Sequence, residues 1–199
     1  MTKERPILFS GPMVAAILSG AKTQTRRVMR NQPIVAYRMG RVEQFCSTGY
    51  PLDSRGYTRE QLAAFCPYGK PGDRLWVRET FMNTRPSRKE IDNVIYRAAF
   101  GVSKPLDPWS SSIHMPRWAS RITLEITNVR VERLQEIPFY DIRAEGLKCP
   151  THDFDSGFCS SECADLRQAW AAGWDALNAK RGYSWDSNPW VWVIEFKKL

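Results

Sequence analysis

Lys22, Thr25 and Glu145 are the residues whose types could support acyl transfer. Lys22 and Thr25 stand three apart in the run Gly-Ala-Lys-Thr-Gln-Thr-Arg-Arg, so an amine and a hydroxyl can converge there. The nearby cations Arg26 and Arg27, with partial desolvation, favour the neutral lysine, which is then a usable base. It could deprotonate Thr25 or a water for attack on an acyl carbon, while Glu145 orients the lysine or passes a proton to the leaving amine. The same run is also typical of an ordinary surface loop, and the residues alone leave both interpretations open.

A second group of candidate side chains lies in the polar segment 148–163. Its pattern is Cys-x2-His-x6-Cys-x3-Cys, formed by Cys149, His152, Cys159 and Cys163. These donors suit tetrahedral zinc, although the spacing is not that of the standard pairs. A surface insertion that contains cysteines but no metal is the alternative. Any zinc here is expected to be structural, because four protein ligands leave no position open for a substrate. We expect no cofactor for the chemistry itself.

Two predicted helices must position the lysine and the glutamate. Residues 6–9 form an apolar strand candidate, and the serine and proline that follow predict the start of a helix that ends at Gly20. The basic run after Gly20 is therefore expected as an exposed cationic loop. Residues 138–146 predict a short helix with Glu145 in its last turn. A carboxylate there opposes the helix dipole unless a cation meets it.

The remaining periodicities complete an α+β prediction. Residues 74–81 alternate as a strand, and residues 122–131 form one long strand or two strands joined at Thr127-Asn128. Residues 166–177 have helical spacing, and 190–196 are apolar at nearly every position, which indicates a strand buried on both faces. We expect one domain over residues 1–199, a small mixed β-barrel with crossover helices and long inserted loops. The insertions are expected near 31–68, 82–112 and 148–163.

The net charge of +8 is concentrated at the N-terminus. Residues 1–42 contain eight basic residues and one acidic residue, a net +7, and arginine outnumbers lysine 20 to 9 in the whole chain. This pattern favours a polyanionic partner such as RNA or DNA, and a solvated basic face is the alternative. Five cysteines, no signal-peptide pattern and no long apolar run predict a cytoplasmic protein without a membrane partner.

Side chains outside the basic run could also contact a nucleic acid or nucleoside. Trp76 lies on the strand face opposite Leu75 and Val77, with an arginine on either side of it. Such a face suits base stacking and phosphate contact, and the alternative is that Trp76 packs under an insertion. The candidate binding residues are Arg26, Arg27, Trp76, Arg78, Arg117 and Trp118.

Four blocks of the chain resemble the ASCH family, small barrels of the PUA-like group. These are Gly-Ala-Lys-Thr-Gln-Thr-Arg-Arg, the strand 71–81, Ala144-Glu145-Gly146 and the closing strand 188–196. The long middle, the Trp-rich end and the segment His-Met-Pro-Arg-Trp-Ala-Ser-Arg are similar to the version found in prophages. Some bacterial members are acetylcytidine amidohydrolases. The resemblance implies that Lys22, Thr25 and Glu145 take the family's catalytic roles here.

Two functions therefore remain open from the sequence. The first is an enzyme that hydrolyses the amide of acetylated cytidine or a related acyl-nucleoside. The second is a non-catalytic RNA- or DNA-binding module, or a ribonuclease of phage origin, whose basic run contacts phosphates. A phage-encoded protein whose basic patch binds an acidic host partner is a third interpretation.

Overall fold

The computed structural model describes residues 2–38, 41–46, 57–99, 109–149 and 164–199, and its mixture of helices and strands confirms the α+β class. Five strands form the main sheet, in the order β1-β5-β8-β9-β2. The elements are β1 (Glu4–Leu8), α1 (Gly11–Leu18), β2 (Gln24–Val28), β3 (Ile34–Arg38), β4 (Arg41–Cys46), α2 (Arg59–Ala63), β5 (Arg74–Arg78), β6 (Phe81–Asn83), β7 (Val94–Tyr96), β8 (Thr123–Arg133), α3 (Phe139–Ala144), α4 (Ala164–Asn178) and β9 (Trp190–Lys198).

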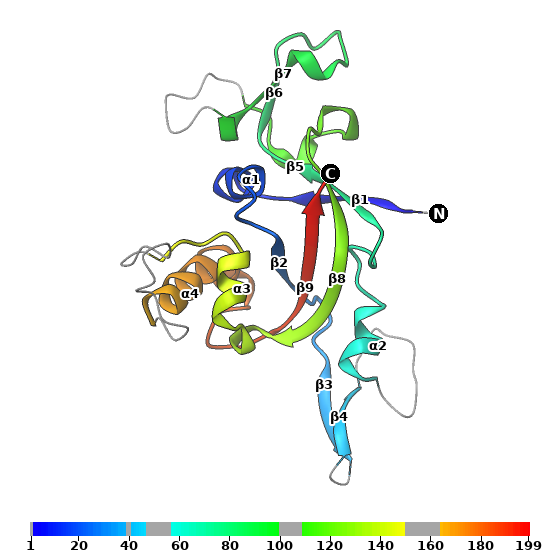
Figure 1. The fold of residues 1–199 in the computed structure, drawn as a ribbon, viewed down its shortest axis with the longest axis vertical. Helices are drawn as coiled ribbons and strands as arrows, with labels where there is room; N and C mark the ends of the chain where they lie inside the picture. Colours follow the sequence, from blue (N-terminus) through cyan, green and yellow to red (C-terminus); the bar gives the residue numbers. More distant parts are fainter. Residues whose placement is uncertain (1, 39–40, 47–56, 100–108, 150–163) are drawn as a thin grey trace.

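The main sheet is mixed and open. β1 and β5 are parallel, and the pairs β5–β8, β8–β9 and β2–β9 are antiparallel. The long, curved strands β8 and β9 form its centre (Figure 1), and β1 and β2 are its edges. Among the described strands no hydrogen-bonded ladder joins these two edges, so the sheet is not closed into a barrel. The pairs β3–β4 and β6–β7 form separate two-stranded sheets.

Strand β9 is buried on both faces, as the sequence predicts. Trp192 and Ile194 belong to the core that contains Ile7 of β1, whereas Val191 and Val193 belong to a second core. Alternation with a period of two sends these neighbours to opposite sides. α3 and α4 cover the second face, and α1 lies near the N-terminal end of β2 (Figure 1). β9 therefore lies between two hydrophobic cores, and the edge strand β2 is hydrogen-bonded to it.

Two of the three predicted insertions contain regular secondary structure. Segment 31–68 contains β3, β4 and α2, and segment 82–112 contains most of β6 and all of β7. Nearly all of 148–163 lies outside the described residues. The predicted strand region 122–131 corresponds to the single strand β8, which has an irregular register between Ile126 and Asn128. None of the described helices has the length and apolar character needed to cross a membrane.

Candidate functional site

The basic run does not form the exposed loop expected from its sequence. Gln24–Val28 is strand β2, paired with β9, and Lys22, Thr25 and Arg26 have exposed fractions of 2%, 3% and 4%. Pairing with β9 satisfies the backbone, and acidic side chains meet the buried cations. Burial of these charges is therefore compensated, as a low-dielectric interior requires.

The buried pair Lys22 and Glu145 joins the two predicted helix ends. The Nζ of Lys22 donates to Oε2 of Glu145 at 2.6 Å and to its backbone oxygen at 2.9 Å. The two residues also form an isolated antiparallel bridge, and the amide of Thr23 donates to the carbonyl of Ala144 at 2.8 Å. Main-chain and side-chain contacts therefore fix the same two residues. Lys22 is the cation that Glu145 needs at the end of α3.

Gly146 allows this approach. Its φ of +87° lies in the left-handed region that ends many helices, so its place at the end of α3 agrees with the prediction. A Cβ at this position would lie 2.9 Å from the Cβ of Ala16 and 3.0 Å from the Cβ of Lys22. A larger residue would push Lys22 away from Glu145.

The surroundings of Lys22 favour its neutral form. Burial lowers the pKa of Lys22 most strongly, and the charges of Arg27 and Arg26 lower it further. The charge of Glu145 and its hydrogen bond oppose this shift, but the pKa remains below its ordinary value. The direction agrees with the effect predicted for clustered cations and desolvation.

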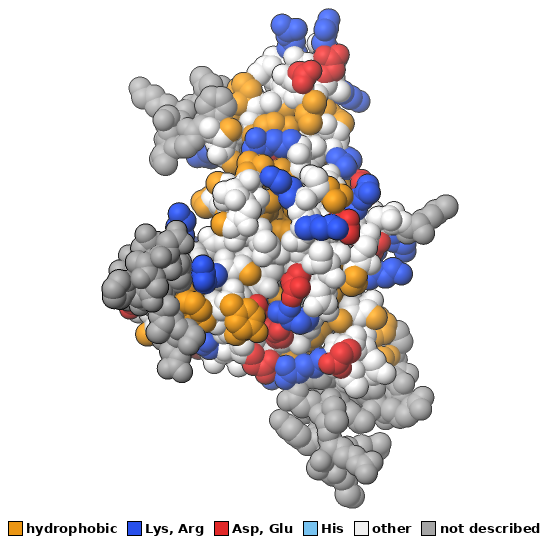
Figure 2. All heavy atoms as spheres, viewed as in Figure 1, with side chains coloured by type: hydrophobic (Ala, Val, Ile, Leu, Met, Phe, Trp, Pro, Cys, Tyr) orange, Lys and Arg blue, Asp and Glu red, His pale blue; other side chains and the backbone are white. Residues whose placement is uncertain are grey.

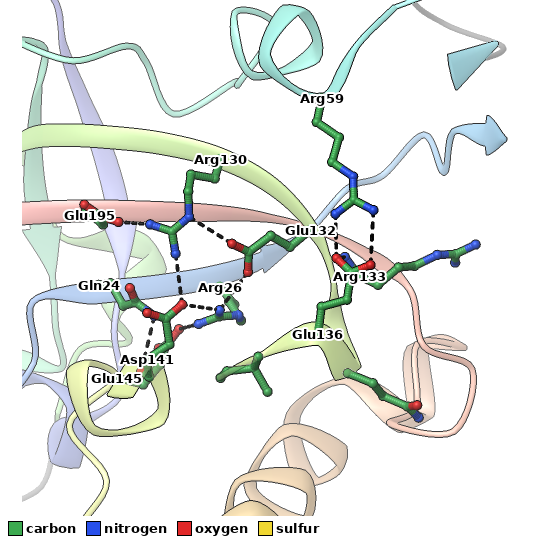
Figure 3. A network of polar contacts seen from close by, with 12 residues as sticks. Gln24, Arg26, Arg59, Arg130, Glu132, Arg133, Glu136, Asp141, Glu145 and Glu195 are labelled. Atoms are coloured by element: carbon green, nitrogen blue, oxygen red, sulfur yellow. Dashed lines mark hydrogen bonds and ion pairs between the residues drawn. The ribbon is translucent and has the colours of Figure 1, made fainter. Parts of the chain in front are cut away.

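Arg26 contacts three carboxylates. Its Nη2 lies 2.6 Å from Asp141 and 2.9 Å from Glu132, and its Nη1 lies 3.4 Å from Oε1 of Glu145 (Figure 3). The side chain has no exposed surface. We expected Arg26 to contact a substrate or nucleic acid, but the carboxylates already occupy both terminal nitrogens. Its position makes it a partner of Glu145.

Arg130, whose side chain is partly exposed, extends these ion pairs toward solvent. This residue of β8 contacts Asp141 at 2.9 Å and Glu132 at 2.8 Å, and it also pairs with Glu195 of β9 (Figure 3). We call Lys22, Arg26, Arg130, Glu132, Asp141, Glu145 and Glu195 the ion-pair cluster. Three cations face four carboxylates in it, so its own charges nearly cancel.

A cavity of about 310 Å³ lies beside the ion-pair cluster. It is at the lower end of the ~300–1,000 Å³ range of small-molecule sites. Glu145 and Thr25 line it, whereas Lys22 does not and contacts the lining through the carboxylate of Glu145. The hydroxyl of Thr25 makes no hydrogen bond to the described residues. Other lining residues include Arg26, Arg27, Tyr68, Trp170, Trp174 and Arg181.

The remaining predicted binding residues do not line this cavity. Trp76 is buried, and the guanidinium of Arg78 lies 5.0 Å from its ring centre, so the expected Arg-Trp-Arg face is not an open surface. Arg117 is exposed and pairs with Glu4 at 3.0 Å, while Trp118 packs against a small core near β6 and β7. Basic and acidic side chains are interspersed on the face seen in Figure 2.

Of the zinc candidates, Cys149 is buried, and His152, Cys159 and Cys163 lie outside the described residues. The described part of the chain contains no group of three or more His, Cys, Asp or Glu placed to hold a metal ion. The zinc site therefore remains a prediction.

Sequence reasoning missed Asp141 and Glu132 as partners of Arg26, and it missed several of the residues that line the cavity. Asp141 could have been found, because it stands four residues before Glu145 and shares its helix face. Trp170 and Trp174 were expected as core. They are buried in the second core and also line the cavity. No local pattern signals Tyr68 or Arg181.

The comparisons with known proteins leave the family open: no family model, curated protein or solved structure matches the chain.

Proposed function

We propose that this protein is an ASCH-type member of the PUA-like group that hydrolyses the amide of acetylated cytidine or a related acyl-nucleoside. The observation that carries the proposal is the buried contact of 2.6 Å between Lys22 and Glu145, 123 positions apart, at a cavity that Thr25 also lines. An ion pair with a titratable amine beside a ligand-sized cavity is a typical setting for proton transfer. The resemblance of the four sequence blocks supports the same reaction.

The proposed reaction uses water and returns the site to its starting state. A water molecule adds to the acyl carbon, and its proton passes to the Lys22–Glu145 pair. The pair gives a proton to the exocyclic nitrogen as the carbon–nitrogen bond breaks, which releases acetate and cytidine. Thr25 either positions this water or attacks the acyl carbon itself. In the second case its oxygen carries the acyl group until water hydrolyses the ester.

The lowered pKa of Lys22 supports a proton-transfer role. A lysine with its ordinary pKa stays protonated near neutral pH and cannot accept a proton. Burial and the neighbouring arginines bring the pKa of Lys22 down, while Glu145 remains within hydrogen-bonding distance to accept or return the proton. The pair can therefore exchange a proton without a large change in the charge of the site.

The RNA- or DNA-binding alternative, with or without ribonuclease activity, depends on arginines that are free to contact phosphates. Arg26 contacts three carboxylates and Arg117 contacts one, so these two contribute little to a phosphate-binding surface. A polyanion held by several phosphates would lose about tenfold or more in affinity between low and physiological salt. Hydrolysis of an uncharged nucleoside should be nearly independent of salt, which separates the two functions.

The direct test is incubation with acetylcytidine and detection of cytidine by chromatography. We expect turnover by the wild type and a fall in kcat/KM of about 10²-fold to 10⁴-fold in Lys22→Met and in Glu145→Gln. Lys89→Met, which changes an exposed lysine outside the cavity, is the matched control and should retain full activity. Circular dichroism checks that each variant is folded. No turnover by the wild type would overturn the proposal.

A further inference from the structure

Two arginines line the cavity without a carboxylate partner. Arg27, on β2, donates from Nη2 to the carbonyl oxygen of Leu8 and lies 5.0 Å from the ring centre of Phe9. Arg181 ends the short 3-10 helix Ala179–Arg181 after α4 and is exposed. Within the described ranges, neither residue forms an ion pair. Arg26, one position before Arg27, has three acidic partners.

Within the described part of the chain, the two arginines give the cavity lining a positive charge that no ion pair compensates. Among the described residues of the lining Glu145 is the acidic one, and its carboxylate already contacts Lys22 and Arg26. Burial lowers the pKa of Arg27 most, and the like charge of Arg181 lowers it too, although the charges of Tyr68 and Glu145 oppose these effects. An anion placed between the arginines would remove the repulsion and offset the desolvation.

Three residues of the cavity lining also carry a buried donor that has no partner among the described residues. The Nε atoms of Arg26 and Arg27 and the indole Nε1 of Trp170 are buried without a hydrogen-bond partner. Each such donor costs on the order of 1–3 kcal/mol, so native proteins rarely leave several together. All three residues line this one cavity. The three nitrogens are closed off from the cavity space, so a ligand could accept from them only after a side-chain shift, and the case for an anion rests on the charges of Arg27 and Arg181.

We infer that the substrate is an acylated nucleotide whose terminal phosphate binds Arg27 and Arg181. This inference rests on the proposed function, because it places the acyl amide at Thr25 and Glu145 of the same cavity. A planar guanidinium group can donate two parallel hydrogen bonds to two oxygens of a phosphate, and these bonds are charge-assisted. The cavity size favours one nucleotide over an RNA strand.

The test compares kcat/KM for acetylcytidine with kcat/KM for its 5′-monophosphate. We expect the nucleotide to be preferred by about tenfold or more, the effect of one or two charge-assisted hydrogen bonds. In Arg181→Gln the preference should fall toward one. Lys180→Gln removes the adjacent exposed charge, which does not line the cavity, and should keep the preference. Equal kcat/KM for both substrates in the wild type would overturn the inference and leave the hydrolase function intact.

Two further measurements distinguish a failure of the phosphate site from a failure of the proposed hydrolase function. If neither compound is hydrolysed, calorimetry with cytidine and its 5′-monophosphate tests the phosphate site alone. Tighter binding of the nucleotide that depends on Arg181 would support the phosphate site at Arg27 and Arg181, although the acylated substrate fails together with the hydrolase proposal. Equal binding of cytidine and its 5′-monophosphate would overturn the phosphate site as well. An acetylcytidine-containing RNA oligonucleotide is the third arm. If it is bound or hydrolysed better than the mononucleotide, the phosphate belongs to an RNA chain and the inference is wrong.

Discussion

Asp73 and Glu145 are both almost fully buried, yet different groups bind their carboxylates. Asp73 lies in the turn before β5 and accepts hydrogen bonds from the backbone amides of Lys3 and Lys70 at 2.9 and 3.3 Å. Arg5 adds a side-chain contact at 3.2 Å. Glu145 contacts the amine of Lys22 at 2.6 Å and Arg26 at 3.4 Å, and neither of these contacts involves a backbone donor.

This difference separates a carboxylate that holds the fold from one that can take part in chemistry. Backbone amides do not release protons near neutral pH, so Asp73 remains an acceptor that ties β1 to the start of β5. The donor at Glu145 is a lysine with a lowered pKa, and the carboxylate lines a cavity. Both carboxylates are buried, so burial does not distinguish them. The proposed role of Glu145 rests on its lysine donor and on the cavity that it lines.

The largest stability effect is expected at the arginine of the Glu145 site. Arg26→Ala would leave Asp141 and Glu132 with weaker partners and Glu145 with Lys22 alone. Breaking a buried ion pair from one side costs about 3–5 kcal/mol, so the urea midpoint should fall strongly. Arg5→Ala at the Asp73 site is the matched comparison. It should cost much less, because Asp73 keeps two backbone donors and Arg5 is one-third exposed. Equal falls in the urea midpoint for Arg26→Ala and Arg5→Ala would contradict the proposed difference between the Glu145 and Asp73 sites.

A smaller loss of stability, without loss of the proposed hydrolysis of acetylcytidine, is expected at Asp73. Asp73→Ala leaves the amides of Lys3 and Lys70 without this acceptor, which should lower the free energy of unfolding by about 1–3 kcal/mol. The activity per folded molecule should not change, because Asp73 does not line the cavity. Asp92→Ala, at an exposed acidic residue, serves as the control and should change neither quantity. A large fall in kcat for Asp73→Ala would show that the two sites are coupled.

Sequence reasoning reached the candidate trio because each member stands in a short motif. The end of α3 was predicted from Gly146, and the unfavourable position of Glu145 pointed to a cation. Residue chemistry offered Lys22 as one possible partner of Glu145, and the family resemblance favoured this pairing, since no local pattern joins positions 123 apart. The structure brings Lys22 and Glu145 together and places Thr25 at the same cavity.

The exposure of the basic run could not be judged from its own residues. Its charge density indicates a surface loop, yet β2 pairs with β9, about 170 residues later in the chain. The acidic partners of Arg26 come from β8 and α3. Long-range pairing thus overrides the local signal. The open sheet, where a barrel was expected, was missed for the same reason. Strand order depends on long-range contacts, which the periodicity of a segment does not reveal.

The smallest expected effect is the pH dependence of the Asp73 contribution. Hydrogen bonding by the amide of Lys3 lowers the pKa of Asp73 most, with further lowering by Lys70 and Arg5, from an ordinary value of 3.8. Near this pH the folded state therefore binds fewer protons than the unfolded state, and stability rises with pH. The contribution should be complete above 3.8 and lost as the pH falls through the lowered pKa. Urea denaturation of wild type and Asp73→Ala at several pH values between 7 and 3.5 measures it. The difference in free energy of unfolding should narrow at the acidic end, whereas a difference that is the same at every pH would mean that the charge of Asp73 contributes nothing.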